Sequence, residues 1–272
     1  MSRLVPFFKM HGAGNDFIMM DHRDLNGLVP GSDSIAALCD RRTGVGADGL
    51  IIIGPGSSPG SSFRMIYYNA DGGEAEMCGN GARCSVSFAH HLGLVRNSCT
   101  FDTQAGLLDG TRHGPEDIEV RLTPWRDLEL EIDVGKTLWP AHHSCDTGVP
   151  HLVIPVDDIE SVPVTEWGSR LRHHGKFSPA GTNVNWVTRV ENSERFQMRT
   201  YERGVEAETL ACGTGASAVA VVLCRLGLAD SPVTLQTRGG DLLIVSIDME
   251  NDELRLRGPA VTSYHGEVLI DE

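Results

Sequence analysis

The chain has 272 residues and a formal net charge of −14, with 40% hydrophobic and 22% charged residues. This length fits one large domain or two ordinary ones, and the composition is typical of a soluble globular protein. The negative charge argues against nucleic acid or an anionic membrane surface as the main partner, because both select for basic patches. No apolar run reaches the length of a membrane span and the N-terminus lacks a secretory signal, so we expect a cytoplasmic protein.

The cysteines give no sign of a zinc site or a disulfide framework, because the chain has seven of them and no C-x-x-C pair. Most are expected to be small buried residues, and Cys84 and Cys224 fit this interpretation because they fall in apolar helical runs. Only Cys78 and Cys212 have neighbours that indicate chemistry.

In chain order, the pattern predicts strands near 7–10 and 17–21, and then a short helix over 34–39 capped near Ser32 or Asp33. Further strands are predicted at 50–53, 63–69, 99–103 and 118–122, with one clear helix that follows Cys78 and ends near Leu92. Short mixed strands around one helix predict an α+β fold rather than a doubly wound sheet.

The second half of the chain repeats the first. Cys78 and Cys212 are 134 residues apart, and the same separation relates Gly14 to Gly148, Tyr67 to Tyr201 and Thr103 to Thr237. A repeat this long predicts two duplicated domains rather than a solenoid. We place them at 1–123 with 262–272 and at 124–261, with a break at Thr123-Pro124-Trp125 and a last strand, 267–270, that returns to the first domain.

Each of these two cysteines directly precedes a Gly-x-Gly turn that leads into a helix: Cys78-Gly79-Asn80-Gly81 and Cys212-Gly213-Thr214-Gly215. A helix N-terminus lowers the pKa of a thiol and offers free backbone amides that bind a carboxylate. Glycine lets the backbone approach a ligand closely. Each half therefore supplies a sulfur acid or base and an anion cradle.

One such cysteine could be a nucleophile paired with a histidine, or simply a small helix-start residue. Two that approach one point from two domains suit the removal of a proton from one face of a carbon and its delivery to the other. No lysine lies in a setting typical of pyridoxal phosphate, and no metal-binding pattern appears. We therefore predict cofactor-free inversion of a stereocentre next to a carboxylate.

At these residues the sequence resembles the diaminopimelate epimerase family, over essentially the whole chain. The segments that carry the resemblance are 9–17, 44–49, 69–83, 181–185, 201–204 and 208–215. It implies two pseudo-symmetric domains, each a mixed, mostly antiparallel sheet around a central helix, with the active site in the cleft between them. It also implies pyridoxal-independent conversion of LL- to meso-diaminopimelate in lysine and peptidoglycan-precursor biosynthesis, by a homodimer that binds no nucleic acid or membrane.

The resemblance also assigns roles to particular residues. Cys78 and Cys212 become the exchanging acid and base, with His151 and Glu202 tuning them. Substrate binding is implied for Asn15, Asn69, Gly79, Asn80, Asn183, Glu202, Arg203, Gly213 and Thr214. In this set the helix-start amides hold the reacting carboxylate and Arg203 pairs with the distal one. Without the resemblance, Asn183 is equally a turn residue, Arg203 a surface ion pair and His151 a core histidine.

Two positions depart from the family pattern. Val149 stands where many members have asparagine before Pro-His, and Gly49 stands where many have glutamine. Two other functions stay open: a related cofactor-independent racemase acting on proline or hydroxyproline, and a non-catalytic carboxylate-binding protein. Arg203 and the asparagines favour a substrate with polar groups at both ends. Oxidation is expected to join Cys78 to Cys212 if their spacing permits a disulfide.

Overall fold

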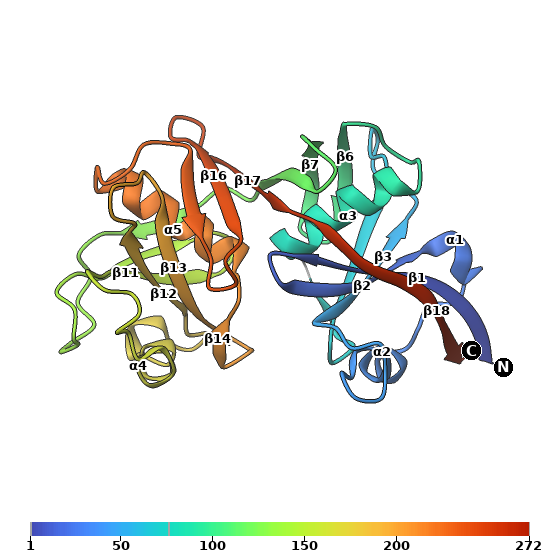
Figure 1. Cartoon of the computed structure of the whole chain (residues 1–272), viewed down its shortest axis with the longest axis horizontal. Coiled ribbons are helices and arrows are strands. Elements are labelled where there is room, and N and C mark those ends of the chain that lie inside the picture. Colours follow the sequence, from blue (N-terminus) through green and yellow to red (C-terminus); the bar gives the residue numbers. More distant parts are fainter. Residues whose placement is uncertain (1, 76, 272) are drawn as a thin grey trace. The chain divides into compact units, whose positions relative to one another are not determined.

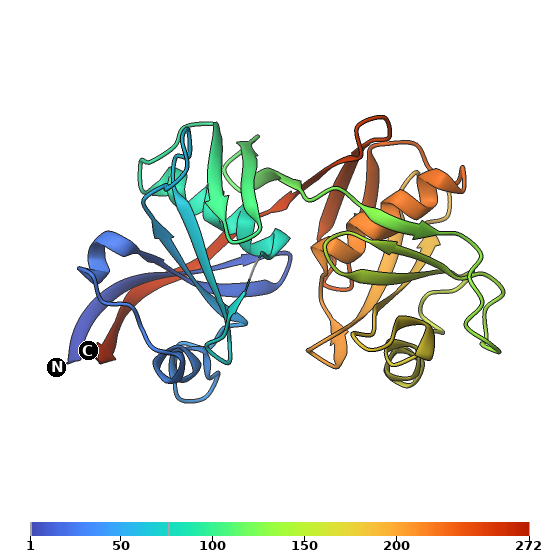
Figure 2. The same ribbon diagram turned by 180° about the vertical axis from the view of Figure 1, so that it is seen from behind.

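The computed structural model describes residues 2–75 and 77–271. Two compact units make up the chain: an N-terminal unit that runs to Val120 and resumes at Gly258, and a C-terminal unit from Arg121 to Arg257. Each unit is a mixed sheet with a long helix, which confirms the predicted α+β class (Figures 1 and 2). Within the described ranges, no helix is both long and apolar enough to cross a membrane.

The N-terminal unit is mostly antiparallel, with parallel pairs between β2 and β3 and between β4 and β6. Its strands are β1 (Ser2–Gly12), β2 (Asn15–Asp21), β3 (Gly49–Gly54), β4 (Arg64–Asn69), β5 (Glu74–Ala75), β6 (Ser98–Thr103), β7 (Gly106–Arg112), β8 (Asp117–Leu122) and β18 (Val261–Asp271). Its helices are α1 (His22–Leu25), α2 (Ser32–Cys39) and α3 (Gly79–His91). The run of β3 is buried at every position, as expected for a strand covered on both faces.

Helix α3 lies at the centre of this unit. It contacts β1, β2, β3, β4 and β7, and most of its residues are buried. It ends where Gly93 takes a positive φ of 72°, which lets the amides of Gly93 and Leu94 bond back to the last carbonyls. The final strand β18 pairs antiparallel with β1, with Leu4 opposite Leu269, so the last segment of the chain belongs to the N-terminal unit (Figure 1).

The C-terminal unit has the same kind of sheet, with parallel pairs between β11 and β12 and between β13 and β15. Its strands are β9 (Arg126–Glu129), β10 (His143–Asp146), β11 (Pro150–Pro155), β12 (Asn183–Arg189), β13 (Phe196–Glu202), β14 (Ala207–Thr209), β15 (Val233–Gln236), β16 (Leu242–Asp248) and β17 (Glu253–Pro259). Its helices are α4 (Val164–Arg172), the 3₁₀ turn η1 (Gly175–Phe177) and α5 (Gly213–Arg225). Helix α5 contacts β10, β11, β12 and β16.

The two units repeat each other at the predicted separation of 134 residues. Helices α3 and α5 begin at Gly79 and Gly213 and end at His91 and Arg225. The parallel pairs also correspond, with Phe17 opposite Gly49 in one unit and His151 opposite Asn183 in the other. The sequence repeat therefore predicted the matching helices, and the strand register before them follows the same separation.

One predicted correspondence between the two halves, that of Tyr67 with Tyr201, was wrong. Tyr201 pairs with Val184 and Glu208 as Tyr68 pairs with Leu50 and Glu74, so Tyr201 corresponds to Tyr68 and not to Tyr67. The connection before β13 is one residue shorter than its counterpart and the turn after it one residue longer. The separation of 134 is therefore restored at the cysteine.

Two local predictions also need correction. Helix α2 begins at Ser32 with Gly31 as its N-cap, and no side chain caps it, so the predicted cap at Ser32 or Asp33 was wrong. Helix α4 was missed because it is short and carries Gly168, which usually weakens a helix. Gly168 is needed because a Cβ there would lie 2.4 Å from Cγ of the Tyr201 ring.

Replacing Gly168 by alanine tests this packing. Alanine normally stabilises a helix interior by about 1 kcal/mol, but overpacking against a buried ring costs about 1–3 kcal/mol. Three atoms of Tyr201 lie within 2.5 Å of this Cβ, which places the cost at the upper end of that range. We therefore expect G168A to lower the free energy of unfolding by about 1–2 kcal/mol in urea denaturation. G175A is the control, because a Cβ at Gly175 meets no atom within 4 Å. A G168A protein as stable as G175A would contradict this account.

Candidate active site

Cys78 and Cys212 occupy the same structural position in their units. Each is the N-cap of the central helix, with φ and ψ of −137° and 122° at Cys78 and of −132° and 113° at Cys212. Cys212 is buried and Cys78 is partly buried. The prediction that each cysteine begins a helix is confirmed, and Gly79, Asn80, Gly213 and Thr214 form the first turns. Glu76, from the same motif, lies outside the described residues.

The second glycine of each turn is tightly packed inside its own unit. A Cβ at Gly81 would lie 2.8 Å from Cδ1 of Ile51, and one at Gly215 would lie 2.5 Å from Oδ1 of Asn185. At Gly215 it would also lie 3.3 Å from the Cys212 sulfur. The sequence had explained these glycines only by the approach of a ligand.

The sulfur of Cys212 has a donating amide and a hydroxyl group beside it. The amide of Gly215 donates to Sγ at 3.4 Å, and Oγ1 of Thr214 lies 3.5 Å from the same atom. The fully buried Thr147 donates to the carbonyl of Thr214 at 2.9 Å and so holds the first turn of α5. Sequence reasoning missed Thr147, whose only signal was its place just before the repeated Gly148.

The sulfur of Cys78 faces an acceptor. Its thiol donates to Oδ1 of Asn15 at 3.5 Å, and Nδ2 of Asn80 donates to the same oxygen at 3.2 Å. Asn15 comes from the turn between β1 and β2, and Asn80 from the first turn of α3. Three residues predicted from the resemblance are thus brought together in the N-terminal unit.

Asn69 and Gly49 lie opposite each other where β3 and β4 pair. Asn69 is exposed, and its Oδ1 accepts a hydrogen bond of 2.9 Å from the hydroxyl of Tyr67. A Cβ at Gly49 would lie 2.4 Å from the carbonyl oxygen of Tyr68. This strand pairing therefore accommodates glycine at position 49.

Asn183 joins two loops of the C-terminal unit. Its Nδ2 donates to the carbonyl of Pro150 at 3.2 Å, and its Oδ1 accepts from the backbone amide of Arg203 at 2.8 Å. The side chain is almost fully buried. One N–H and one lone pair remain for a ligand, and the neighbouring Glu202 and Arg203 are half-buried.

His151 is a neutral, fully buried imidazole. Burial, together with the charge of Arg203, lowers the pKa of His151 to about 3. The network assigns the proton to Nε2, because Nδ2 of Asn185 lies 3.1 Å from Nδ1 and is also bonded to the carbonyl of Leu152. Nε2 has no hydrogen-bond partner among the residues that the structure describes.

Asn185 orients His151 and was not predicted as a site residue. Its Oδ1 accepts from the hydroxyl of Thr200 at 2.9 Å, and all three side chains are buried. Side chains alternate along a strand, so Asn185 lies on the same face of β12 as Asn183. This alternation was the signal in the sequence from which Asn185 could have been predicted. Hydrogen bonding to both ends of the amide leaves the imidazole in one orientation.

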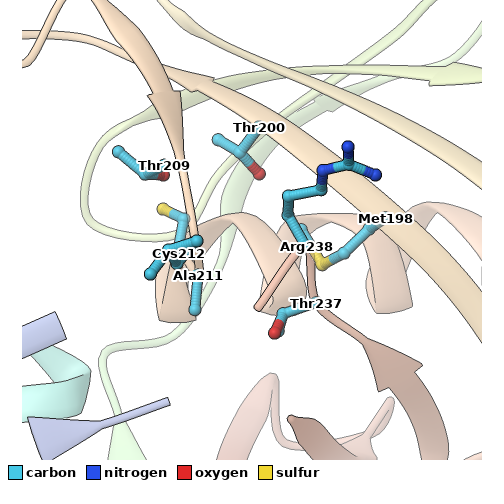
Figure 3. Close-up of a pocket in the computed structure, with 8 residues that line it drawn as sticks. Met198, Thr200, Thr209, Ala211, Cys212, Thr237 and Arg238 are labelled. Carbon is cyan, nitrogen blue, oxygen red and sulfur yellow. The ribbon is translucent and has the colours of Figure 1, made fainter. Parts of the chain in front are cut away.

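A shallow pocket lies beside Cys212 in the C-terminal unit (Figure 3). It is lined by Met198, Thr200, Thr209, Leu210, Ala211, Cys212, Thr237 and Arg238. Within the described chain, Oγ1 of Thr209 and Oγ1 of Thr237 are buried without a hydrogen-bond partner. Arg238 pairs with Glu160 at 3.0 Å. The sequence did not predict this pocket.

These features define a class of α+β proteins built from two similar units, each with a sheet around one central helix. A phenazine biosynthesis protein of the PhzF family from Bacillus anthracis has this fold, with 18% identity, a TM-score of 0.74 and 98% and 100% of the two chains covered. A hydroxyproline epimerase from Agrobacterium vitis has it at 14% identity and a TM-score of 0.74, with 99% and 94% covered. At such identities the likeness shows the fold alone.

Sequence similarity then identifies the family. The model of the family described as diaminopimelate epimerase matches residues 7–124 and 143–268. The chain is 40% identical to the diaminopimelate epimerase of Aquifex aeolicus, with 97% of this chain and 98% of the relative covered. It is 39% identical to that of Chlorobaculum tepidum, with 96% and 100% covered. The chain belongs to the diaminopimelate epimerase family.

The buried neutral His151 predicts a pH dependence of stability. Its folded-state pKa of about 3 lies below the unfolded value of about 6.5, so the unfolded chain binds the extra proton between these values. Stability is therefore lost as the pH falls below about 6.5, by up to about 1.4 kcal/mol per pH unit from this group. We expect H151Q to unfold with a shallower pH slope than the wild type in urea titrations from pH 7 to pH 4.5. Equal slopes would contradict the assignment.

Proposed function

We propose that this protein is a diaminopimelate epimerase that converts LL-2,6-diaminopimelate to meso-diaminopimelate in lysine and peptidoglycan-precursor biosynthesis. The observation that carries the proposal is the pair of cysteines in matching N-cap positions, on helices that begin and end at the same points of a repeated chain. Family membership supports the substrate. The proposed reaction needs no pyridoxal phosphate and no metal, because two sulfurs supply the acid and the base.

The proposed mechanism uses two bases on opposite faces of the α-carbon. A thiolate on one cysteine takes the α-proton, and the electron pair of the broken C–H bond stays on the substrate as a carbanion delocalised into the carboxylate. The thiol of the other cysteine then donates its proton to the opposite face and becomes the thiolate. The reverse reaction exchanges the roles of Cys78 and Cys212.

The helix starts supply the electrostatic part of this mechanism. The first amides of α3 and α5, at Gly79 and Asn80 and at Gly213 and Thr214, have no intrahelical acceptor in a regular helix. We propose that they hold the α-carboxylate, whose negative charge grows as the proton leaves. Closure of the two units around the substrate would exclude water and strengthen these bonds.

The remaining predicted residues take supporting roles in this proposal. Arg203 pairs with the distal carboxylate, which suits its planar guanidinium, and Asn15, Asn69 and Asn183 hydrogen-bond the substrate. Glu202 contacts the substrate and, with His151, tunes the cysteines. The neutral state of His151 supports a role as a fixed N–H donor rather than as a proton acceptor.

A racemase acting on proline or hydroxyproline is the second candidate, because proteins so described share the fold. Arg203 is half-buried, and its backbone amide donates to the side chain of Asn183. A guanidinium held in this way favours a substrate with a second carboxylate. Turnover of proline without turnover of LL-diaminopimelate would replace our proposal with this one. We further propose that the protein acts as a cytoplasmic homodimer, in line with the family.

Alanine at either proposed base tests the mechanism. We expect C78A and C212A each to lower kcat for LL-diaminopimelate, without added pyridoxal phosphate, by at least about a hundredfold, because each removes a proton-transfer group. C224A is the matched control, since this cysteine lies in α5 and away from its start. Activity near the wild-type level in either C78A or C212A would rule out the two-base mechanism.

A further inference from the structure

A continuous chain of four polar side chains runs past Cys78. Asp48 accepts from Nδ2 of Asn15 at 2.6 Å, and Oδ1 of Asn15 accepts from Nδ2 of Asn80 at 3.2 Å. Oδ1 of Asn80 in turn accepts from Arg83 at 2.9 Å. The thiol of Cys78 donates to the oxygen at the middle of this chain, Oδ1 of Asn15, at 3.5 Å.

The two ends of this chain decide which way both amides point. A carboxylate only accepts and a guanidinium only donates. Asp48 therefore requires the NH₂ group of Asn15, and Arg83 requires the oxygen of Asn80. With both ends satisfied, the amide of Asn15 can present only its oxygen to Cys78. Arg83 and Asn80 are buried, so rotation at that end of the chain is blocked by packing.

Asp48 is itself held by a cluster of charges. Arg41 bridges Asp48 and Asp16, with 2.7 Å to each carboxylate, and Lys9 pairs with Asp16 at 2.5 Å. Burial would raise the pKa of Asp16, but its hydrogen bonds and ion pairs with Arg41 and Lys9 lower it to about 2. The backbone amides of Asp16 and Asp48 each donate to the other's carboxylate at 3.2 Å.

The corresponding surroundings of Cys212 differ. There the amide of Gly215 donates to the sulfur, and the hydroxyl of Thr214 lies beside it. A hydrogen bond to the charged form of a group favours that form, and a bond that needs its proton favours the protonated form. An acceptor oxygen at Cys78 thus favours the thiol, and the donating amide of Gly215 at Cys212 favours the thiolate.

We infer that Asp48 is a positioning residue, which fixes the amide of Asn15 so that its oxygen holds Cys78 in the thiol form in the free enzyme. The inference rests on the proposed function, because it explains how two equivalent cysteines begin a turnover as one acid and one base. Asp48 acts only through Asn15 and needs no contact with the substrate.

The test is the pH profile of alkylation of each cysteine by iodoacetamide, resolved by peptide mass spectrometry on the free enzyme. We expect D48A to lower the pH midpoint for Cys78, so that below the midpoint Cys78 is alkylated roughly three- to tenfold faster, the factor set by one hydrogen bond. The profile of Cys212 should not change. N15A should act in the same direction, and the double variant should equal N15A alone.

D48N separates orientation from charge. Its amide oxygen can keep the bonds to Asn15 and to the amide of Asp16, while its NH₂ group turns towards Arg41, which is exposed and can move away. D48N should therefore keep the wild-type profile of Cys78. D40A controls for the loss of an acidic residue on the same loop, because the described hydrogen bonds of the Asp40 side chain go only to Arg42 and Thr43.

A wild-type profile in D48A, or a D48N profile shifted like that of D48A, would overturn the inference. Additive effects of D48A and N15A would do the same. If D48A does not fold, D48N and N15A still test the inference, because only N15A should shift the pH profile of Cys78 alkylation. Since alkylation is measured without substrate, its outcome is independent of whether LL-diaminopimelate is turned over.

Discussion

The arrangement of both units depends on a close approach between the first turn of a buried helix and the strand beneath it. Gly81 lies against Ile51 of β3, and Gly215 lies against Asn185 of β12. A Cβ at either glycine would force its neighbour, the tip of Ile51 or the amide of Asn185, to shift. Each glycine follows the N-cap cysteine by three residues, so the same packed turn places the cysteine at the positive end of the helix. The packing of the helix against the sheet and the position of the reactive cysteine therefore depend on the same turn.

On this common backbone the two units carry different side chains. The N-terminal unit surrounds its cysteine with amides anchored by Asp48 and Arg83. The C-terminal unit places the amide of Gly215 and the hydroxyl of Thr214 beside its cysteine, and Thr147 holds the carbonyl of Thr214. The symmetry of the backbone suits two sulfurs that exchange roles, and the difference in side chains suits a defined starting state. A duplicated fold can provide both.

Much of this could be predicted from the sequence, because the decisive signals are local. The cysteine before a Gly-x-Gly turn and the glycine after the helix, Gly93 or Gly227, mark both ends of each helix, and the repeat confirms them. Contacts between distant segments could not be predicted. Asn185 and Thr200 meet His151 only after β11, β12 and β13 pair, and Asp48 reaches Asn15 from a separate loop. The shifted Tyr201 was missed for a related reason, since an inserted and a deleted residue cancel along the chain.

The central claim is that two sulfurs work on opposite faces of one carbon, and isotope incorporation from solvent tests it most directly. The reaction would be started in deuterium oxide from LL-diaminopimelate and, separately, from the meso isomer, and stopped at low conversion. The two-base account predicts deuterium at the α-carbon of the product and hardly any in the recovered substrate, in both directions. A product that keeps the substrate's own hydrogen, or deuterium that appears equally in both compounds, would contradict it.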